Sequence, residues 1–137
     1  MRDHGRQGAP PPGAVGCSYE FSRDLQGQAK KMGRPWEIGK AFEQSGPVGP
    51  LQSASDVGHL DTGLIELRVN GDVKQTGDMN QMIWKVPEMI SYLSDYFELA
   101  AGDVIMSGTP SGVGPIQRGD EMVLTIQGLD DLTVKVI

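Results

Sequence analysis

The sequence is poor in cysteine, histidine and aromatic residues. It has one cysteine, Cys17, and two histidines, and aromatic residues make up 6% of the chain. One cysteine excludes an internal disulfide framework and a cysteine-cluster zinc site, and it is compatible with a reducing compartment. There is also no long apolar run and no apolar stretch at the N-terminus of the kind found in signal peptides. We therefore expect a cytoplasmic protein that does not act on membranes.

Positive charge is scarce as well. The chain has 12 Lys and Arg against 18 Asp and Glu, which gives a formal net charge of -6. Binding to nucleic acid or to an anionic membrane depends on a surplus of Lys and Arg close to phosphate. We therefore expect no nucleic-acid partner, and we expect any anionic substrate to be held by a few local cations.

The sequence also lacks a recognisable cluster of metal ligands. The two histidines, His4 and His59, are far apart, so a histidine-based catalytic triad or zinc site is not expected. The acidic residues are scattered, and no Glu-x-Glu or His-x-x-x-His pair marks a preformed site. From the residues alone, the metal ligands are therefore unknown.

Glycine and proline, in contrast, are abundant. The 19 Gly and 9 Pro among 137 residues indicate strands and turns rather than a helical bundle. A chain of this length fits one domain. Residues 1–16 have no apolar period and contain the triplet Pro10 to Pro12, so we expect a disordered tail there and a folded domain over 17–137.

Two helices and a series of strands are predicted. Ser22 is a candidate N-cap for a helix over about 23–32, which Gly33 ends. Apolar residues spaced along one helical face, with Pro87 in the first turn, predict a second helix over 86–97.

Strands account for most of the remaining pattern. The dipeptide Asn70-Gly71 separates two strand-like segments, 64–69 and 72–75, and predicts a hairpin whose turn accepts positive φ. The C-terminal third is predicted to be a β-meander interrupted by a glycine-rich loop. Its expected elements are a short strand at 104–106, the loop at 107–114, and strands at 121–126 and 132–137.

The loop from Gly108 to Gly114 is a candidate anion-binding segment. It follows a buried-type strand, and its glycines allow backbone amides to face a ligand. It is not a P-loop, because no Gly-Lys-Ser/Thr follows, and no helix follows to make a dinucleotide fingerprint. The alternative, an irregular connection without a ligand, stays open.

Three further side chains are candidates for binding an anionic substrate. Lys40 is flanked by aromatic and small residues, which suits a partly desolvated cation beside a carboxylate or carbonyl. Arg23 and Gln26 are one helical turn apart at the predicted helix N-terminus, where the helix dipole favours an anion. For all three, an ordinary solvated surface position is the alternative.

Several segments, in order, resemble the fumarylacetoacetate hydrolase family. They are 22–26, 33–36, 39–42, 69–71, 82–83 and 102–114. The stretches 33–42 and 82–88 look closest to the fumarylpyruvate hydrolase, or acylpyruvase, branch. The resemblance implies an α+β fold, a β-rich mixed β-roll of the family's C-terminal type with two short helices. It also implies a homodimer and a Mg²⁺ or Mn²⁺ cofactor.

The resemblance also implies a reaction and roles for the candidates. The reaction is metal-dependent hydrolysis of a carbon-carbon bond in an acylpyruvate-type 2,4-dioxo acid such as fumarylpyruvate, in aromatic catabolism. By the family pattern, Lys40 and Arg23 hold substrate oxygens, Gln26 orients them, and Thr109 with Gly108 binds the substrate carboxylate. The alternatives are a decarboxylase or isomerase of the same family, or a non-catalytic remnant or pseudoenzyme.

The chain departs from the family pattern at its N-terminal end. The family's Glu-x-Glu metal pair and its water-activating His and Glu belong to a segment before the one that this sequence matches. The position of the third metal carboxylate, normally Asp, is occupied by Tyr19, with Glu20 beside it. We therefore expect an N-terminally truncated or frame-disrupted chain with a partial catalytic domain at 17–137. Such a chain should expose strand edges and apolar surface, so we expect poor solubility or self-association.

Overall fold

The computed structural model describes the backbone of residues 13–14 and all of residues 22–137. Its helices are α1 (Arg23–Lys31), α2 (Ala54–Val57) and α3 (Val86–Ser94), with 3-10 helices η1 (Glu37–Gly39) and η2 (Met79–Gln81). Its strands are β1 (Gly13–Ala14), β2 (Gln52–Ser53), β3 (Leu64–Val69), β4 (Asp72–Asp78), β5 (Glu121–Ile126) and β6 (Leu132–Lys135). The α+β class predicted from the sequence is confirmed.

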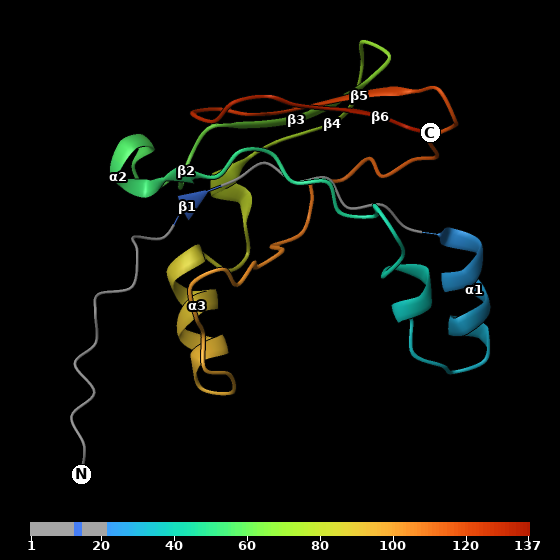
Figure 1. Cartoon of the computed structure of the whole chain (residues 1–137), viewed down its shortest axis with the longest axis horizontal. Coiled ribbons are helices and arrows are strands. Elements are labelled where there is room, and N and C mark those ends of the chain that lie inside the picture. The colour runs from blue at the N-terminus through green and yellow to red at the C-terminus, as the bar shows by residue number, and fades with distance from the viewer. Residues whose placement is uncertain (1–12, 15–21) are drawn as a thin grey trace.

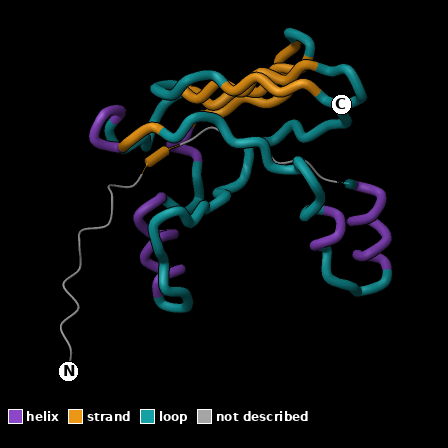
Figure 2. The backbone as a smooth tube through the Cα atoms, in the orientation of Figure 1, coloured by secondary structure: helices purple, strands orange, loops and turns teal. Residues whose placement is uncertain are grey.

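The main sheet has four strands in the order β4-β3-β5-β6, and each described pairing is antiparallel. Figure 2 shows these strands together as one layer, with the helices outside it. In β4 the register shifts, because Leu67 faces Gln75 whereas Arg68 faces Val73. Lys74 is thus an extra residue in β4, which makes a β-bulge there.

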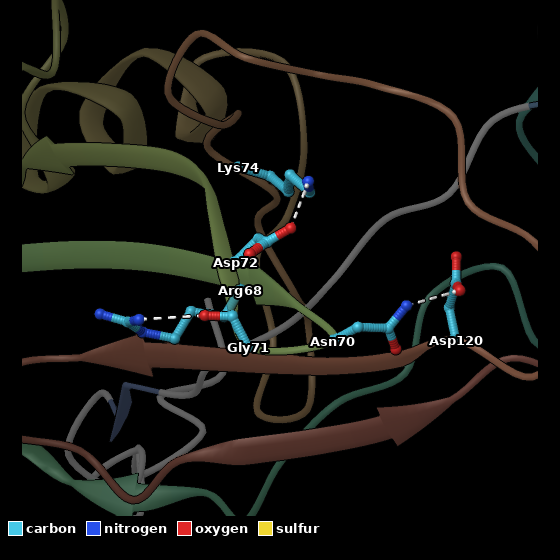
Figure 3. A network of polar contacts seen from close by, with 6 residues as sticks. All are labelled: Arg68, Asn70, Gly71, Asp72, Lys74 and Asp120. Atoms are coloured by element: carbon cyan, nitrogen blue, oxygen red, sulfur yellow. Dashed lines mark hydrogen bonds and ion pairs between the residues drawn. The ribbon is translucent and has the colours of Figure 1, made fainter.

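The predicted hairpin turn is confirmed, and it is tied to a third strand. Asn70 and Gly71 have φ of 52° and 87°, the left-handed conformations that this dipeptide tolerates. The Asn70 side chain donates to Asp120 Oδ1 at 2.8 Å and accepts from the backbone N–H of Glu121 at 3.0 Å. Figure 3 shows this contact beside the bonds from Arg68 to the Gly71 carbonyl and from Lys74 to Asp72.

The core lies on one face of this sheet. Val69 of β3 pairs directly with Met122 of β5, and both side chains are buried. Leu124, two residues further along β5, points to the same face and is buried too. Many other large apolar side chains are exposed, and Ile83, at 94%, is the extreme case.

The two predicted helices are confirmed and lie on the same side of the sheet, α3 towards one end and α1 towards the other (Figure 1). α1 begins after Ser22 and ends before Gly33, whose φ is 62°. α3 begins after Lys85, whose backbone N–H donates to Glu88 at 2.7 Å, and it ends at Ser94, earlier than predicted.

One expectation was wrong, and one short helix was not predicted. Residues 104–106 form no strand in the described structure, because no neighbouring segment pairs with them and a strand requires such a ladder. The helix that was not predicted is α2, a single turn with Ser53 as its N-cap. The Ser53 Oγ accepts a hydrogen bond from the Ser55 backbone N–H at 3.3 Å. No helix in the described part of the chain is both long and apolar enough to span a bilayer.

The N-terminal predictions fall largely outside the described residues. Gly13 and Ala14 pair with β2, whereas the rest of the predicted tail at 1–16 is not described. Tyr19 and Glu20 likewise lie outside the described residues.

Candidate functional site

Arg23, Gln26 and Lys40 are brought together in residues 22–40, which we call the α1–η1 unit. The backbone N–H of Ser22 donates to the Gly39 carbonyl at 2.9 Å, which closes the unit between the start of α1 and the end of η1. Gly39 is buried against α1, and a Cβ there would lie 2.9 Å from the Gln26 backbone nitrogen. Glycine therefore permits the close approach that places Lys40 beside the first turn of α1.

Lys40 lies over an aromatic ring, as the flanking residues suggested. Its Nζ atom is 5.8 Å from the centre of the Trp36 ring, within the range of a cation–π contact. The side chain is half-buried, so its ammonium is partly desolvated while still accessible to an anion. This position suits a cation that binds a substrate oxygen.

The first turn of α1 also carries a carboxylate. Ser22 has the extended backbone of an N-cap, but its hydroxyl donates to Asp24 Oδ1 at 2.7 Å instead of capping the helix backbone. The Ser22 hydroxyl and the Leu25 backbone N–H lower the pKa of Asp24 below its ordinary value. Asp24 is therefore a carboxylate at neutral pH, and its charge stabilises the helix N-terminus next to Arg23.

Thr109 and Gly108 lie on the glycine loop, residues 107–114, which rests on β4. The side-chain amide of Gln75 donates to Thr109 Oγ1 at 2.9 Å and to the Pro110 carbonyl at 2.5 Å. Gly112 has φ of 105° and lies so close to β4 that a Cβ would overlap the Lys74 carbonyl oxygen. The loop is therefore held at the bulge of β4, with Thr109 exposed.

The predicted site residues thus fall into two groups on separate elements. Within residues 22–137, no hydrogen bond or ion pair joins Arg23 or Gln26 to the glycine loop. Figure 1 shows the loop as part of the orange segment that follows α3, whereas α1 and η1 lie towards the opposite end of the sheet from α3. The structure holds each group on its own elements, and joint action of the two groups on one ligand is a proposal.

Gln75 is a residue that sequence reasoning missed. It lies among Lys74 and other polar residues of β4, a pattern typical of an exposed strand, yet its side chain is 8% exposed. No signal in the sequence marked it, because a regular two-residue hairpin would place Gln75 opposite Glu66, whereas the structure pairs it with Leu67. The bulge that produces this register is not visible in the sequence.

The described residues contain no cluster of metal-ligating side chains. Across 13–14 and 22–137, no three His, Cys, Asp or Glu side chains converge in a way that could hold a metal ion. The metal ligands are therefore still unknown. Tyr19 and Glu20 lie outside the residues described.

Comparisons with known proteins identify the fold. The sequence-family model of the fumarylacetoacetate hydrolase C-terminal region matches residues 19–137. A fumarylpyruvate hydrolase from Pseudomonas aeruginosa, whose crystal structure contains Mn²⁺ and pyruvate, is 51% identical with a TM-score of 0.82. That likeness covers 85% of this chain and 50% of the other.

Oxaloacetate tautomerases are similar as well. That of Escherichia coli is 45% identical over 116 residues, which are 84% of this chain and 52% of the relative. The mitochondrial enzyme of Homo sapiens is 39% identical over 120 residues, 88% of this chain and 54% of the relative. The chain therefore spans about half the length of the curated relatives that it matches.

Proposed function

The chain belongs to the fumarylacetoacetate hydrolase family, and from that premise we propose that it provides the substrate-binding half of an acylpyruvate hydrolase of the fumarylpyruvate type. The family includes hydrolases and tautomerases, so it is a family of enzymes. The observation that carries the proposal is the 51% identity and TM-score of 0.82 with the Pseudomonas aeruginosa hydrolase, which was crystallised with pyruvate. Pyruvate is a product that cleavage of fumarylpyruvate would release.

In this proposal, the two groups of side chains bind different parts of one 2-oxo acid. The Thr109 hydroxyl and the Gly108 backbone N–H bind the carboxylate, and Lys40 and Arg23 hold the carbonyl oxygens. Gln26, one turn after Arg23 on α1, orients these oxygens. Water adds to the distal carbonyl, the carbon-carbon bond breaks, and the pyruvate fragment leaves as an enolate that takes up a proton at carbon.

Negative charge develops on the enolate oxygen as that bond breaks. Cations fixed in advance near this oxygen stabilise the transition state more than the uncharged carbonyl of the substrate. We assign this role to Lys40, whose half-buried position over Trp36 supports it. A divalent ion such as Mn²⁺ or Mg²⁺, when bound, would supply Lewis-acid stabilisation of the same oxygen, although no three described His, Cys, Asp or Glu side chains converge to hold it.

A second candidate function is oxaloacetate tautomerisation. It is favoured by the 45% and 39% identity with the bacterial and human tautomerases. Interconversion of the enol and keto forms passes through the same enolate but requires no attack of water on a distal carbonyl. The cations of the α1–η1 unit would serve both reactions, so binding geometry alone does not separate them.

Product analysis tests the proposal. The chain is incubated with Mn²⁺ or Mg²⁺ and either fumarylpyruvate or the enol form of oxaloacetate. Release of pyruvate and fumarate, lost in Lys40→Met but kept in the surface control Lys30→Met, is the expected result. Faster decay of the oxaloacetate enol without cleavage of fumarylpyruvate would contradict the hydrolase proposal and support the tautomerase. No turnover of either substrate would identify a non-catalytic remnant.

A further inference from the structure

Gln75 is a buried polar side chain at an irregular point of β4. It follows the bulge at Lys74 and faces Leu67 of β3. Its side chain is 8% exposed, whereas both Lys74 and Thr76 are exposed. Burial of an amide without hydrogen-bond partners is unfavourable, so the hydrogen bonds of Gln75 offset the cost of burying it.

Those contacts settle the orientation of the Gln75 amide. Its Nε2 atom lies 2.5 Å from the Pro110 carbonyl oxygen and 2.9 Å from Thr109 Oγ1. A carbonyl oxygen can only accept a hydrogen bond, so the amide must present its NH₂ group to the loop. One amide proton then goes to Pro110, and the other goes to Thr109.

This orientation determines how the Thr109 hydroxyl can act. A hydroxyl has one proton to donate and two lone pairs that accept. Because Gln75 donates to Thr109, one lone pair is occupied and the proton of the hydroxyl is left for another acceptor. Thr109 is exposed, so this proton is accessible to a bound carboxylate.

The same stretch of β4 fixes the loop backbone. Gly112 lies over the Lys74 carbonyl without room for a Cβ, and Pro110 packs against Gly77, where a Cβ would be 3.4 Å from the proline ring. Residues 74–77, which we call the loop seat, thus contact the loop on both sides of Gln75, through Lys74 and through Gly77. A loop held before binding loses less conformational entropy when the ligand arrives.

From these contacts we infer that Gln75 is a positioning residue, which keeps the Thr109 hydroxyl as a hydrogen-bond donor to the carboxylate of the 2-oxo acid. The inference rests on the proposed function for the role of Thr109 and extends it to a residue 34 positions away in sequence. Gln75 itself does not touch the substrate.

The substitution Gln75→Glu tests the direction of this hydrogen bond with little change in shape. The introduced carboxylate accepts the Thr109 proton instead of donating to the hydroxyl, so pyruvate binding with Mn²⁺ should weaken about tenfold at pH 8. At pH 5 the introduced carboxyl, whose pKa burial raises, is protonated. It then competes less for the Thr109 proton and has one proton to donate, so part of the affinity should return. The wild-type chain should show a smaller change between these pH values.

The exposed residue Gln117 provides the matched control. The substitution Gln117→Glu adds the same charge outside the loop seat and should leave pyruvate binding unchanged. If Gln75→Glu binds pyruvate as tightly as wild type at pH 8, the positioning role is overturned. Equal weakening at pH 8 and pH 5 would also overturn it, because loss of fold rather than loss of a donor would explain that result.

A measurement without ligand separates this inference from the proposed function. In ¹H–¹⁵N NMR spectra, the Gln75 side-chain amide protons should exchange with water more slowly than those of Gln117. Their resonances should shift in Thr109→Val, which removes the hydroxyl. Exchange as fast as in Gln117 would overturn the pairing. Slow exchange in a wild-type chain that does not bind pyruvate would leave the pairing intact and count against the proposed function.

Discussion

The α1–η1 unit and the glycine loop both carry candidate substrate-binding residues, but contacts of different range hold them. Within the α1–η1 unit, Ser22 and Gly39 close a segment of 18 residues through one backbone hydrogen bond. The glycine loop is held by Gln75, 34 residues earlier in the chain, and the sheet behind it is tied by the bond from Asn70 to Asp120. Local sequence therefore specifies the first group, whereas the second depends on the completed sheet.

The largest effect is expected where the loop meets its seat. Gly112→Ala should lower the free energy of unfolding by about 3 kcal/mol, because the new Cβ overlaps the Lys74 carbonyl and φ is 105°. Gly108→Ala is the matched control, since φ is 98° but no atom lies within 4 Å. It should lose only about 1 kcal/mol. Urea denaturation followed by circular dichroism measures both, and equal losses would show that contact with the seat does not hold the loop.

A second pair of glycines probes the α1–η1 unit. Gly39→Ala should lower stability by about 2 kcal/mol, because its Cβ would lie 2.9 Å from the Gln26 nitrogen. Gly27→Ala, in open space in the middle of α1, should raise stability by about 0.5 kcal/mol through better helix propensity. The midpoints of thermal unfolding report both signs. If Gly39→Ala also stabilised the chain, the close approach of η1 to α1 would be wrong.

The same contrast explains what could be predicted from the sequence. The end of α1 follows from Gly33, and the hairpin turn follows from Asn70-Gly71, because short-range chemistry determines these features. The role of Gln75 could not be predicted, because it depends on a bulge and on a loop far along the chain. The strand predicted at 104–106 was wrong for the same reason, because strand formation depends on pairing with a neighbouring segment.

Function, in contrast, was predicted from family resemblance and not from local patterns. The fumarylacetoacetate hydrolase family was predicted from the resemblance of ordered segments and is confirmed by the match over residues 19–137. Patterns alone left Lys40, Arg23 and the glycine loop as candidates with ordinary alternatives. Their roles in catalysis, the homodimer and the cytoplasmic location stay predictions.

A smaller effect is expected at the hairpin turn behind the loop seat. Asn70→Ala should lower stability by about 1 kcal/mol, since it removes two hydrogen bonds and places alanine at a φ of 52°. Asn80→Ala, whose exposed side chain makes no described hydrogen bond, should change stability by less than about 0.5 kcal/mol. If urea denaturation shows the same loss of stability for both variants, the hydrogen bonds of Asn70 do not stabilise the turn.

The smallest expected effect is on the stability of the fold at acidic pH. The Asn70 amide, followed by the Gln117 backbone N–H, lowers the pKa of Asp120 below its ordinary value of 3.8. A lowered pKa in the folded state stabilises the fold above the unfolded value, and this contribution disappears as pH falls through the folded pKa. Stability should therefore decline less steeply below pH 4 in Asp120→Asn than in wild type. Parallel acid unfolding curves would contradict this account.

Whether the two groups bind one molecule is tested most directly by a double-mutant cycle. Isothermal titration calorimetry, with Mn²⁺ present, measures the Kd of pyruvate for wild type, Lys40→Met, Thr109→Val and the double variant. The proposed site predicts that each single substitution weakens binding about tenfold and that the double variant binds more weakly than either. Affinity that responds to only one of the two substitutions would contradict a shared site.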